Sequence, residues 1–130
     1  MDKLKRTSLH YAALQNDVGA VRDLLAGGAE VDAQDANGFT PLHFAAQEYS
    51  LGSAVELLEH GAKVDVPNKF GNTPLGTAVF ESNGRGEMIL LLRKHGADPL
   101  HLNNYGQNPI GLARLIGNYD VRQFFADIGE

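Results

Sequence analysis

Apolar residues in this chain fall into short helical patterns that come in pairs. In the pair that begins at Thr40, Leu42, Ala45 and Ala46 have the i, i+3 and i+4 spacing that places them on one helix face. Thr40 can cap this first helix through its side-chain oxygen. After a short polar connection, a second run places Val55, Leu57 and Leu58 inward and ends at a glycine. The pattern therefore predicts two short helices packed against each other.

The paired pattern recurs along most of the chain. The strings TSLHYAA, TPLHFAA, TPLGTAV and NPIGLAR begin at residues 7, 40, 73 and 108, which gives spacings of 33, 33 and 35 residues. A second marker, GGAEVD, HGAKVD and HGADPL, follows each of the first three strings, and a turn glycine recurs at Gly38, Gly71 and Gly106. Self-similarity at this period is typical of layers that stack to share one continuous core.

These markers resemble those of the ankyrin repeat family, whose repeat is a β-turn followed by two antiparallel helices. The resemblance extends from about residue 7 to residue 128. It implies an all-α fold, an ankyrin-repeat solenoid of four helix-turn-helix repeats joined by β-hairpin-like loops. We expect a single domain over 1–130, with repeats at approximately 1–34, 35–67, 68–102 and 103–130. The last helix is expected over residues 120–128.

Two departures from the regular repeat affect the expected structure. The third interval is longer by two residues, which the glycine spacings place in the loop 82–86, and we interpret them as tolerated length variation. The motif histidine is present as His10 and His43 but is replaced by Gly76 and Gly111. In the family this histidine ties neighbouring repeats together by hydrogen bonds, so we expect the C-terminal half to be the looser half.

Composition limits which classes of partner, and which cellular compartment, are expected for the chain. The chain has 130 residues, a net charge of −5 and no cysteine, so disulfides are excluded and a basic surface for nucleic acid or an anionic membrane is not expected. The N-terminus lacks the apolar stretch of a secretory signal, and no window is apolar enough to span a membrane. We therefore expect a cytoplasmic chain that is a monomer on its own.

No convincing catalytic, cofactor-binding or metal-binding constellation emerges from the sequence. The fragment Gly84-Arg85-Gly86 begins like a dinucleotide motif, but the third glycine is missing and no strand precedes it. The histidines recur because the repeat recurs, and Ser8 takes the place of the motif proline beside His10. We therefore expect neither an enzyme nor a metal or cofactor site.

In the family, partners dock on a concave face formed by the loop tips and the exposed sides of the first helices. Mapped onto this chain, that face carries aromatic rings on successive tips, with acidic residues beside them. Exposed aromatic residues gathered in this way indicate a surface that contacts a partner. The alternative is that the rings lie flat on the neighbouring repeat. The expected partner-binding residues are Phe39, Glu48, Lys69, Phe70, Asn72, Phe80, Glu81, Asn104 and Tyr105.

The resemblance implies a non-enzymatic protein-binding module. One specific form is an inhibitor or immunity protein that blocks a partner toxin or enzyme, and the acidic balance suits a partner with a basic surface. The alternatives are an adaptor or assembly subunit of a larger complex, a scaffold built for stability without a natural partner, and, more remotely, an enzyme. Irregular repeats argue against the built scaffold.

Overall fold

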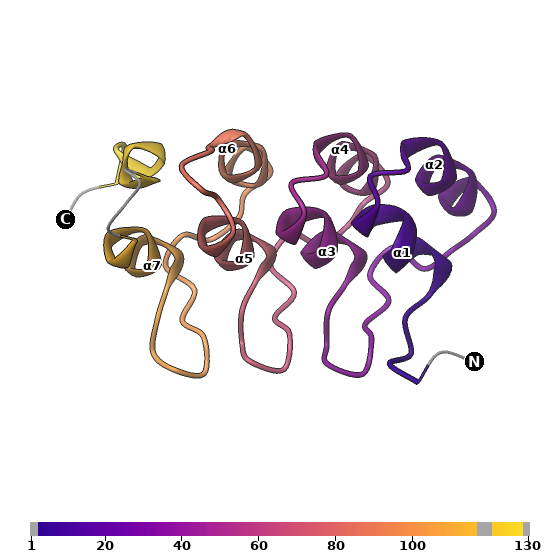
Figure 1. Ribbon diagram of the computed structural model, residues 1–130, viewed down its shortest axis with the longest axis horizontal. Coiled ribbons are helices and arrows are strands. Elements are labelled where there is room, and N and C mark those ends of the chain that lie inside the picture. Colours follow the sequence, from indigo (N-terminus) through magenta and orange to yellow (C-terminus); the bar gives the residue numbers. More distant parts are fainter. Residues whose placement is uncertain (1–2, 117–120, 129–130) are drawn as a thin grey trace.

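The computed structural model describes residues 3–116 and 121–128 and shows four stacked layers, each made of two helices (Figure 1). The first helices α1, α3, α5 and α7 form one row, the second helices form the other, and long loops project from the first row. The pairs are α1 (Ser8–Leu14) with α2 (Val18–Ala26), α3 (Pro41–Gln47) with α4 (Leu51–Glu59), α5 (Pro74–Phe80) with α6 (Glu87–Lys94), and α7 (Pro109–Leu115) with the 3-10 helix η1 (Val121–Phe125). The described part of the chain contains no β-strand, and the all-α prediction is confirmed.

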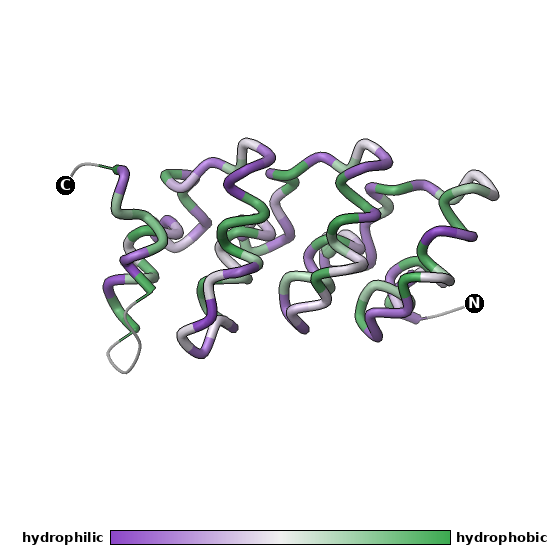
Figure 2. Tube along the Cα trace, turned by 90° about the horizontal axis from the view of Figure 1, so that it is seen from above, coloured by the Kyte–Doolittle hydropathy of each residue, from purple (hydrophilic) through white to green (hydrophobic). Residues whose placement is uncertain are grey.

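One continuous core runs through the layers. Hydrophobic stretches recur in every helix pair while hydrophilic residues fill much of the connections, as Figure 2 shows along the chain. Leu42, Ala45 and Ala46 are fully buried, as their spacing predicts, and Leu57 is buried in α4. The small alanines allow adjacent first helices to approach closely. Val55, which we also expected to face inward, is instead 36% exposed.

The motif histidines join consecutive layers. His43 Nδ1 lies 3.0 Å from the backbone nitrogen of Thr40, and His43 Nε2 lies 2.8 Å from the Asn72 carbonyl oxygen in the next layer. His10 makes the corresponding contact, with Nε2 2.8 Å from the Phe39 carbonyl oxygen. These contacts confirm the bridging role that the family resemblance implied.

Neighbouring loop tips are also joined by main-chain hydrogen bonds. The Lys69 N–H donates to the Asn37 carbonyl at 2.9 Å, and the Asn104 N–H donates to the Phe70 carbonyl at 2.9 Å. Gly71 has φ +78°, and a Cβ there would lie 2.7 Å from the Asn104 nitrogen, so this turn requires glycine for its conformation and for the close approach of the next tip. The loop tips around residues 37, 70 and 104 are therefore linked by main-chain hydrogen bonds into one row below the first helices, which we call the main-chain rail.

The two-residue insertion in the third layer has a packing role that its sequence did not indicate. The Tyr49 hydroxyl donates to the Arg85 carbonyl at 2.8 Å, and the Arg85 guanidinium lies 4.1 Å from the centroid of the Tyr49 ring. On the other side, Gly86 is buried under Phe124, whose ring occupies the place that a Cβ on this glycine would need. The insertion loop thus connects the second layer with the fourth.

The last helix differs from expectation. We expected a helix from Asp120 to Ile128, whereas the structure has a 3-10 helix over Val121–Phe125, and Asp120 lies outside the described residues. Phe125 is buried and Phe124 is half-buried. Arg93 fastens this element by donating to the Phe124 carbonyl at 2.8 Å and to the Asp127 carboxylate at 2.7 Å.

Candidate functional site

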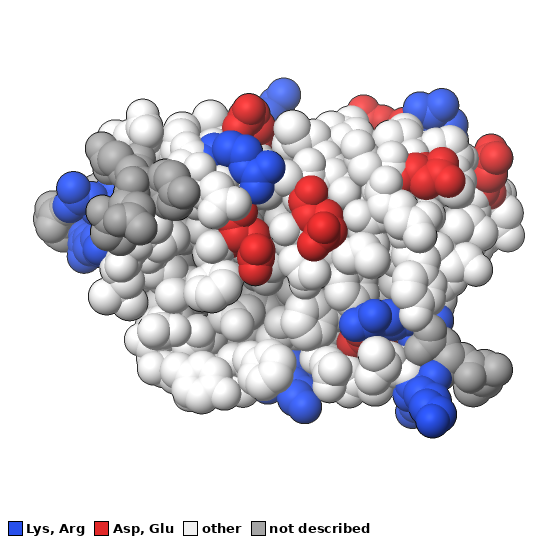
Figure 3. Space-filling model, viewed as in Figure 1, with Lys and Arg blue, Asp and Glu red and all other residues white. Residues whose placement is uncertain are grey.

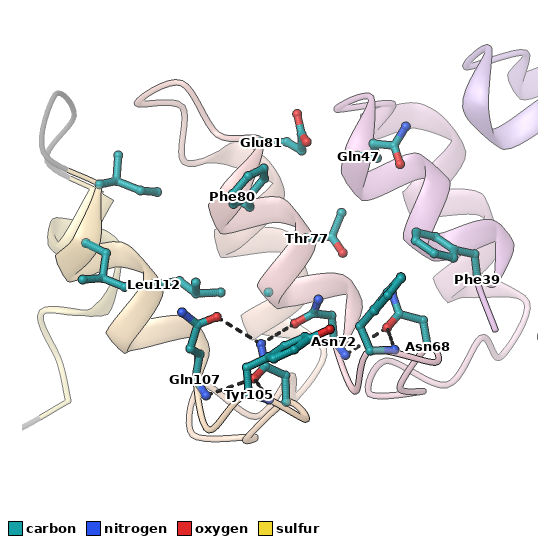
Figure 4. Close-up of a pocket in the computed structure, with 15 residues that line it drawn as sticks. Phe39, Gln47, Asn68, Asn72, Thr77, Phe80, Glu81, Tyr105, Gln107 and Leu112 are labelled. Carbon is teal, nitrogen blue, oxygen red and sulfur yellow. Dashed lines mark hydrogen bonds between the residues drawn. The ribbon is translucent and has the colours of Figure 1, made fainter. Parts of the chain in front are cut away.

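A hollow of about 510 Å³ opens on the face formed by the first helices and the loop tips of the last three layers. Its size is within the range of pockets that receive a ligand or a partner's side chain. Phe80 and Thr77 project from α5 between Leu112 on one side and Phe39 on the other, with Tyr105 below them (Figure 4). The surface over this part of the face is mostly uncharged, and acidic side chains lie above it with basic side chains among them (Figure 3).

The lower border of the hollow is formed by two tip aromatics, Phe70 and Tyr105. The Asn68 side-chain oxygen accepts the Phe70 N–H at 2.9 Å, and the Asn103 side-chain oxygen accepts the Tyr105 N–H at 2.8 Å. These short-range bonds fix the turn and leave the rings outside it. Phe70 is 36% exposed and Tyr105 is 70% exposed.

The helices supply the inner wall and the upper edge. Thr77 and Phe80 are three residues apart in α5, as are Leu112 and Leu115 in α7, so each pair shares one helix face. Phe80 and Leu115 are both 71% exposed. Large apolar side chains exposed to this degree and gathered around one cavity are unusual on a monomer surface and mark contact sites.

Gly76 makes room for the hollow. It occupies the position of His10 and His43, whose rings fill the equivalent space in the first two layers. A Cβ built at Gly76 would meet only Asn72 and Leu112, at 3.8 and 4.0 Å, which are ordinary contact distances. The loss of the histidine therefore removes a bridge between layers and leaves an open space in its place.

Side-chain amides replace the missing bridge at the base of the hollow. Asn103 Nδ2 donates to the Asn72 side-chain oxygen at 2.9 Å and approaches the Gln107 side-chain oxygen at 3.4 Å. Asn104 Nδ2 donates to the Lys69 carbonyl at 2.8 Å. The third and fourth layers are thus joined by amides where the earlier layers use histidine, and the base of the hollow is polar.

Two carboxylates lie along the helix end of this face. Glu48 and Glu81 occupy equivalent positions 33 residues apart and are the C-cap residues of α3 and α5. A negative charge is unfavourable at the negative end of a helix dipole, so local stability does not explain this choice of residue. Within the described part of the chain, neither carboxylate forms an ion pair.

The N-terminal half of the same face is filled. The Phe39 and Phe44 rings stack with centroids 5.4 Å apart, and the Arg6 guanidinium lies 4.8 Å from the Phe44 centroid. Phe39 also contacts His43 at a centroid distance of 5.4 Å. The expectation that Phe39 projects from a tip like Phe70 is therefore wrong, because Phe39 follows its turn glycine while Phe70 precedes its own.

The hollow brings together six of the nine residues expected to bind a partner, although Phe39 contributes only a half-buried ring. Glu48, Lys69 and Asn104 do not line it. The Lys69 ammonium lies 5.3 Å from the Phe70 centroid, and Asn104 is committed to the tip-to-tip contact. The six lining residues are Phe39, Phe70, Asn72, Phe80, Glu81 and Tyr105.

Sequence reasoning missed the contribution of the fourth layer. Leu112, Leu115 and Ile116 line the hollow and correspond to Thr77, Phe80 and Glu81 of the layer before. These residues could have been predicted by adding the 35-residue spacing between TPLGTAV and NPIGLAR to the positions of the third repeat. The first helix of the fourth layer, α7, therefore belongs to the same face as α3 and α5.

Among the buried titratable groups, His43 has the clearest shift. Burial lowers the pKa of His43 from 6.5 to about 4, against the opposing effect of the hydrogen bond to the Asn72 carbonyl. Among the described residues there is no group of three histidine, cysteine or acidic side chains that could hold a metal ion. None of the described helices has the length and apolar content needed to cross a membrane.

Comparison with known families agrees with this architecture. The family described as "Ankyrin repeats (3 copies)" matches residues 9–103, and the chain belongs to the ankyrin repeat family. Ankyrin repeats generally act as protein–protein interaction modules. No curated protein matches the chain.

Proposed function

We propose that this chain is a non-enzymatic protein-binding module that docks a partner on the face carrying the hollow. The observation that carries the proposal is the gathering of Phe80, Tyr105 and Leu115, each at least 70% exposed, around one cavity. Burying such side chains against a partner removes apolar surface from water, and aromatic side chains are enriched among the residues that dominate binding energies. The proposed contact set comprises Phe39, Glu48, Lys69, Phe70, Asn72, Phe80, Glu81, Asn104 and Tyr105.

The specific form of this function is inhibition: the chain covers the active site of a toxin or enzyme as an immunity protein does. The net charge of −5 and the carboxylates beside the hollow suit a partner with a basic surface. The proposed setting is the cytoplasm, where a chain without cysteine needs no oxidising environment.

Capture from a native lysate tests the binding function. The bait is the folded chain, and the test variant combines Phe70→Ala, Phe80→Ala and Tyr105→Ala. We expect the captured partner to be lost, because removing central aromatic contacts typically costs about 2 kcal/mol each. The matched control is Leu90→Ala, which removes a side chain that is 50% exposed on α6, away from the hollow. Equal recovery by the triple variant and the wild type would show that the face is wrong.

An activity assay on the captured partner separates inhibition from an adaptor role. For an inhibitor, adding one equivalent of chain to the purified partner abolishes the partner's activity, and the triple variant restores it. An adaptor or assembly subunit leaves that activity unchanged while bringing a third component into the complex. Unchanged activity at saturation would exclude the inhibitor form and leave the binding module.

A further inference from the structure

We propose that the hollow at Gly76 receives one bulky apolar side chain of the partner, and that a lysine or arginine close to it in the partner's sequence pairs with Glu48 and Glu81. This inference rests on the proposed binding function and specifies its partner. It commits to a protein segment with an aromatic residue or leucine as its anchor and a basic residue beside the anchor. The shape of the hollow, its lining and the distribution of charge around it favour such a segment.

Part of the hollow exists because the third layer lacks a side chain that the first two layers carry. The histidine at the first two equivalent positions is fully buried between layers, whereas Gly76 has no side chain and Thr77 beside it is small. The hollow of about 510 Å³ includes this space and is bordered by the exposed rings of Phe80 and Tyr105 and by Leu115. An aromatic or leucine side chain fits such a space and contacts apolar surface on several sides.

The polar groups at the base restrict how the anchor's backbone can lie. Asn103 is committed to its tip and to Asn72, so its oxygen and amide group are already used within the protein. Asn72 and Gln107 line the same base and carry amide groups that can also donate. A partner main chain that crosses the hollow can therefore present carbonyl oxygens to these amides while its side chain enters the apolar part.

The charges at the two ends of the face favour one orientation of a docked partner segment. Glu81 lines the hollow at the C-terminal end of α5, and Glu48 occupies the same position one layer earlier. The one lysine among the proposed contact residues, Lys69, lies on the opposite side, at the loop tips. A basic partner residue is therefore attracted to the carboxylates at the helix end of the face and repelled from Lys69 at the tip end. The Arg85 guanidinium donates to the Glu81 carbonyl at 3.1 Å and offsets the partial negative charge of the α5 C-terminus, so the attraction rests on the two carboxylates.

Peptide selection on the intact chain tests this inference without knowledge of the partner. The probe is a phage-displayed library of random linear peptides selected against the folded protein. We expect enriched sequences to contain an aromatic residue or leucine with a lysine or arginine within a few positions. An empty selection, or enrichment of acidic or entirely polar sequences, would overturn the inference.

Variants locate the bound peptide. Fluorescence anisotropy of one labelled, enriched peptide gives its Kd for each variant. Gly76→His should fill the floor of the hollow with the residue that the earlier layers carry and weaken binding at least about tenfold. Phe80→Ser removes an exposed wall residue without touching the core and should also weaken binding at least about tenfold. The control Leu90→Ala should change the affinity by less than about twofold.

A charge variant tests the second element of the proposal. Combining Glu48→Gln and Glu81→Gln should weaken peptide binding by roughly three- to tenfold at low salt and flatten its salt dependence, since exposed charge pairs are modest and screened. Unchanged affinity in Gly76→His, with the variant shown to be folded by circular dichroism, would mean that the anchor binds elsewhere. Unchanged salt dependence in the double variant would remove the role of the carboxylates.

These outcomes are distinguishable from failure of the proposed function. If the wild type captures a native partner whose binding survives Gly76→His but not the triple aromatic variant, the protein-binding face stands and the anchor pocket is wrong. If neither the triple variant nor Gly76→His affects capture, the proposed face itself is wrong. If both abolish capture while Leu90→Ala does not, both proposals hold.

Discussion

His43 makes the stability of this protein depend on pH, and the substitution His43→Ala can measure its contribution. A backbone N–H can only donate and a carbonyl can only accept, so the bond from the Thr40 N–H and the bond to the Asn72 carbonyl require a neutral ring with its proton on Nε2. The ring is fully buried. His43→Ala removes both hydrogen bonds and leaves the buried Thr40 N–H without this partner.

The cost at neutral pH can be worked out from these contacts. Two neutral hydrogen bonds contribute about 1 kcal/mol each, and a buried donor left without an acceptor costs roughly another 1–3 kcal/mol. We therefore expect His43→Ala to lower the free energy of unfolding by about 3–5 kcal/mol at pH 7. That is a large fraction of the stability of a domain of this size.

Acidification should reduce this difference. Burial lowers the pKa of His43 from 6.5 to about 4 in the folded state, so the unfolded chain binds the extra proton first as the pH falls. The stability that the neutral ring provides is complete above pH 6.5 and is progressively lost as the pH falls toward 4. The shift corresponds to a loss of roughly 3 kcal/mol at pH 4. Wild type and His43→Ala should then differ in stability by only about 0–2 kcal/mol.

Urea unfolding followed by circular dichroism at pH 7 and pH 4 measures the two differences. Ala45→Gly is the control, because it weakens the same helix by about 1 kcal/mol without removing a titrating group. The difference between Ala45→Gly and wild type should be the same at both pH values. If the difference for His43→Ala is also the same at both, the buried neutral histidine is not the cause of the acid sensitivity, and the assignment of its ring protons is wrong.

Three further substitutions test the contacts that hold the ends and the insertion in place. Gly86→Ala should destabilise the fold by about 1–3 kcal/mol in thermal unfolding, because the new methyl group overlaps the Phe124 ring. Gly19→Ala, whose methyl group would meet only the Asp17 carboxylate at an ordinary contact distance of 3.9 Å, should be neutral or stabilising by up to about 1 kcal/mol. Tyr49→Phe removes the bond to the insertion loop and should cost about 1 kcal/mol, with faster hydrogen exchange in the segment 82–86. Arg93→Gln should cost about 1 kcal/mol through loss of the bond to the Phe124 carbonyl, and high salt should not reproduce this loss.

The layered fold was predictable because its determinants are local and repeated. Thr40 with Pro41 starts a helix, Gly61 ends the next one with φ +87°, and each signal returns one repeat later. The bridging by His43 followed from the family resemblance and is confirmed. Whether the C-terminal half is looser stays a prediction for hydrogen exchange, and the amide contacts of Asn103 now give that half a bridge of its own.

The candidate site was predictable only in part, because a cavity depends on which side chains are absent from a space bordered by several layers. The sequence shows Gly76 as the loss of a hydrogen bond, but the space that it opens depends on Thr77 and Leu112 of two different layers. The stacking of Phe39 on Phe44 depends on a ring one helical turn away from the cap, which a list of tip residues does not include. The contact of Phe124 with Gly86 joins segments that share no repeat marker.

The main-chain rail along the loop tips has an evolutionary consequence. The hydrogen bonds that link the tips use backbone atoms, such as the Lys69 N–H and the Asn104 N–H, so they survive a change of side chain. Substitutions at Phe70 or Tyr105 can therefore alter what the surface recognises while the scaffold keeps its shape. Selection can retarget such a protein to a diverging partner by single mutations, without first having to restore a damaged fold.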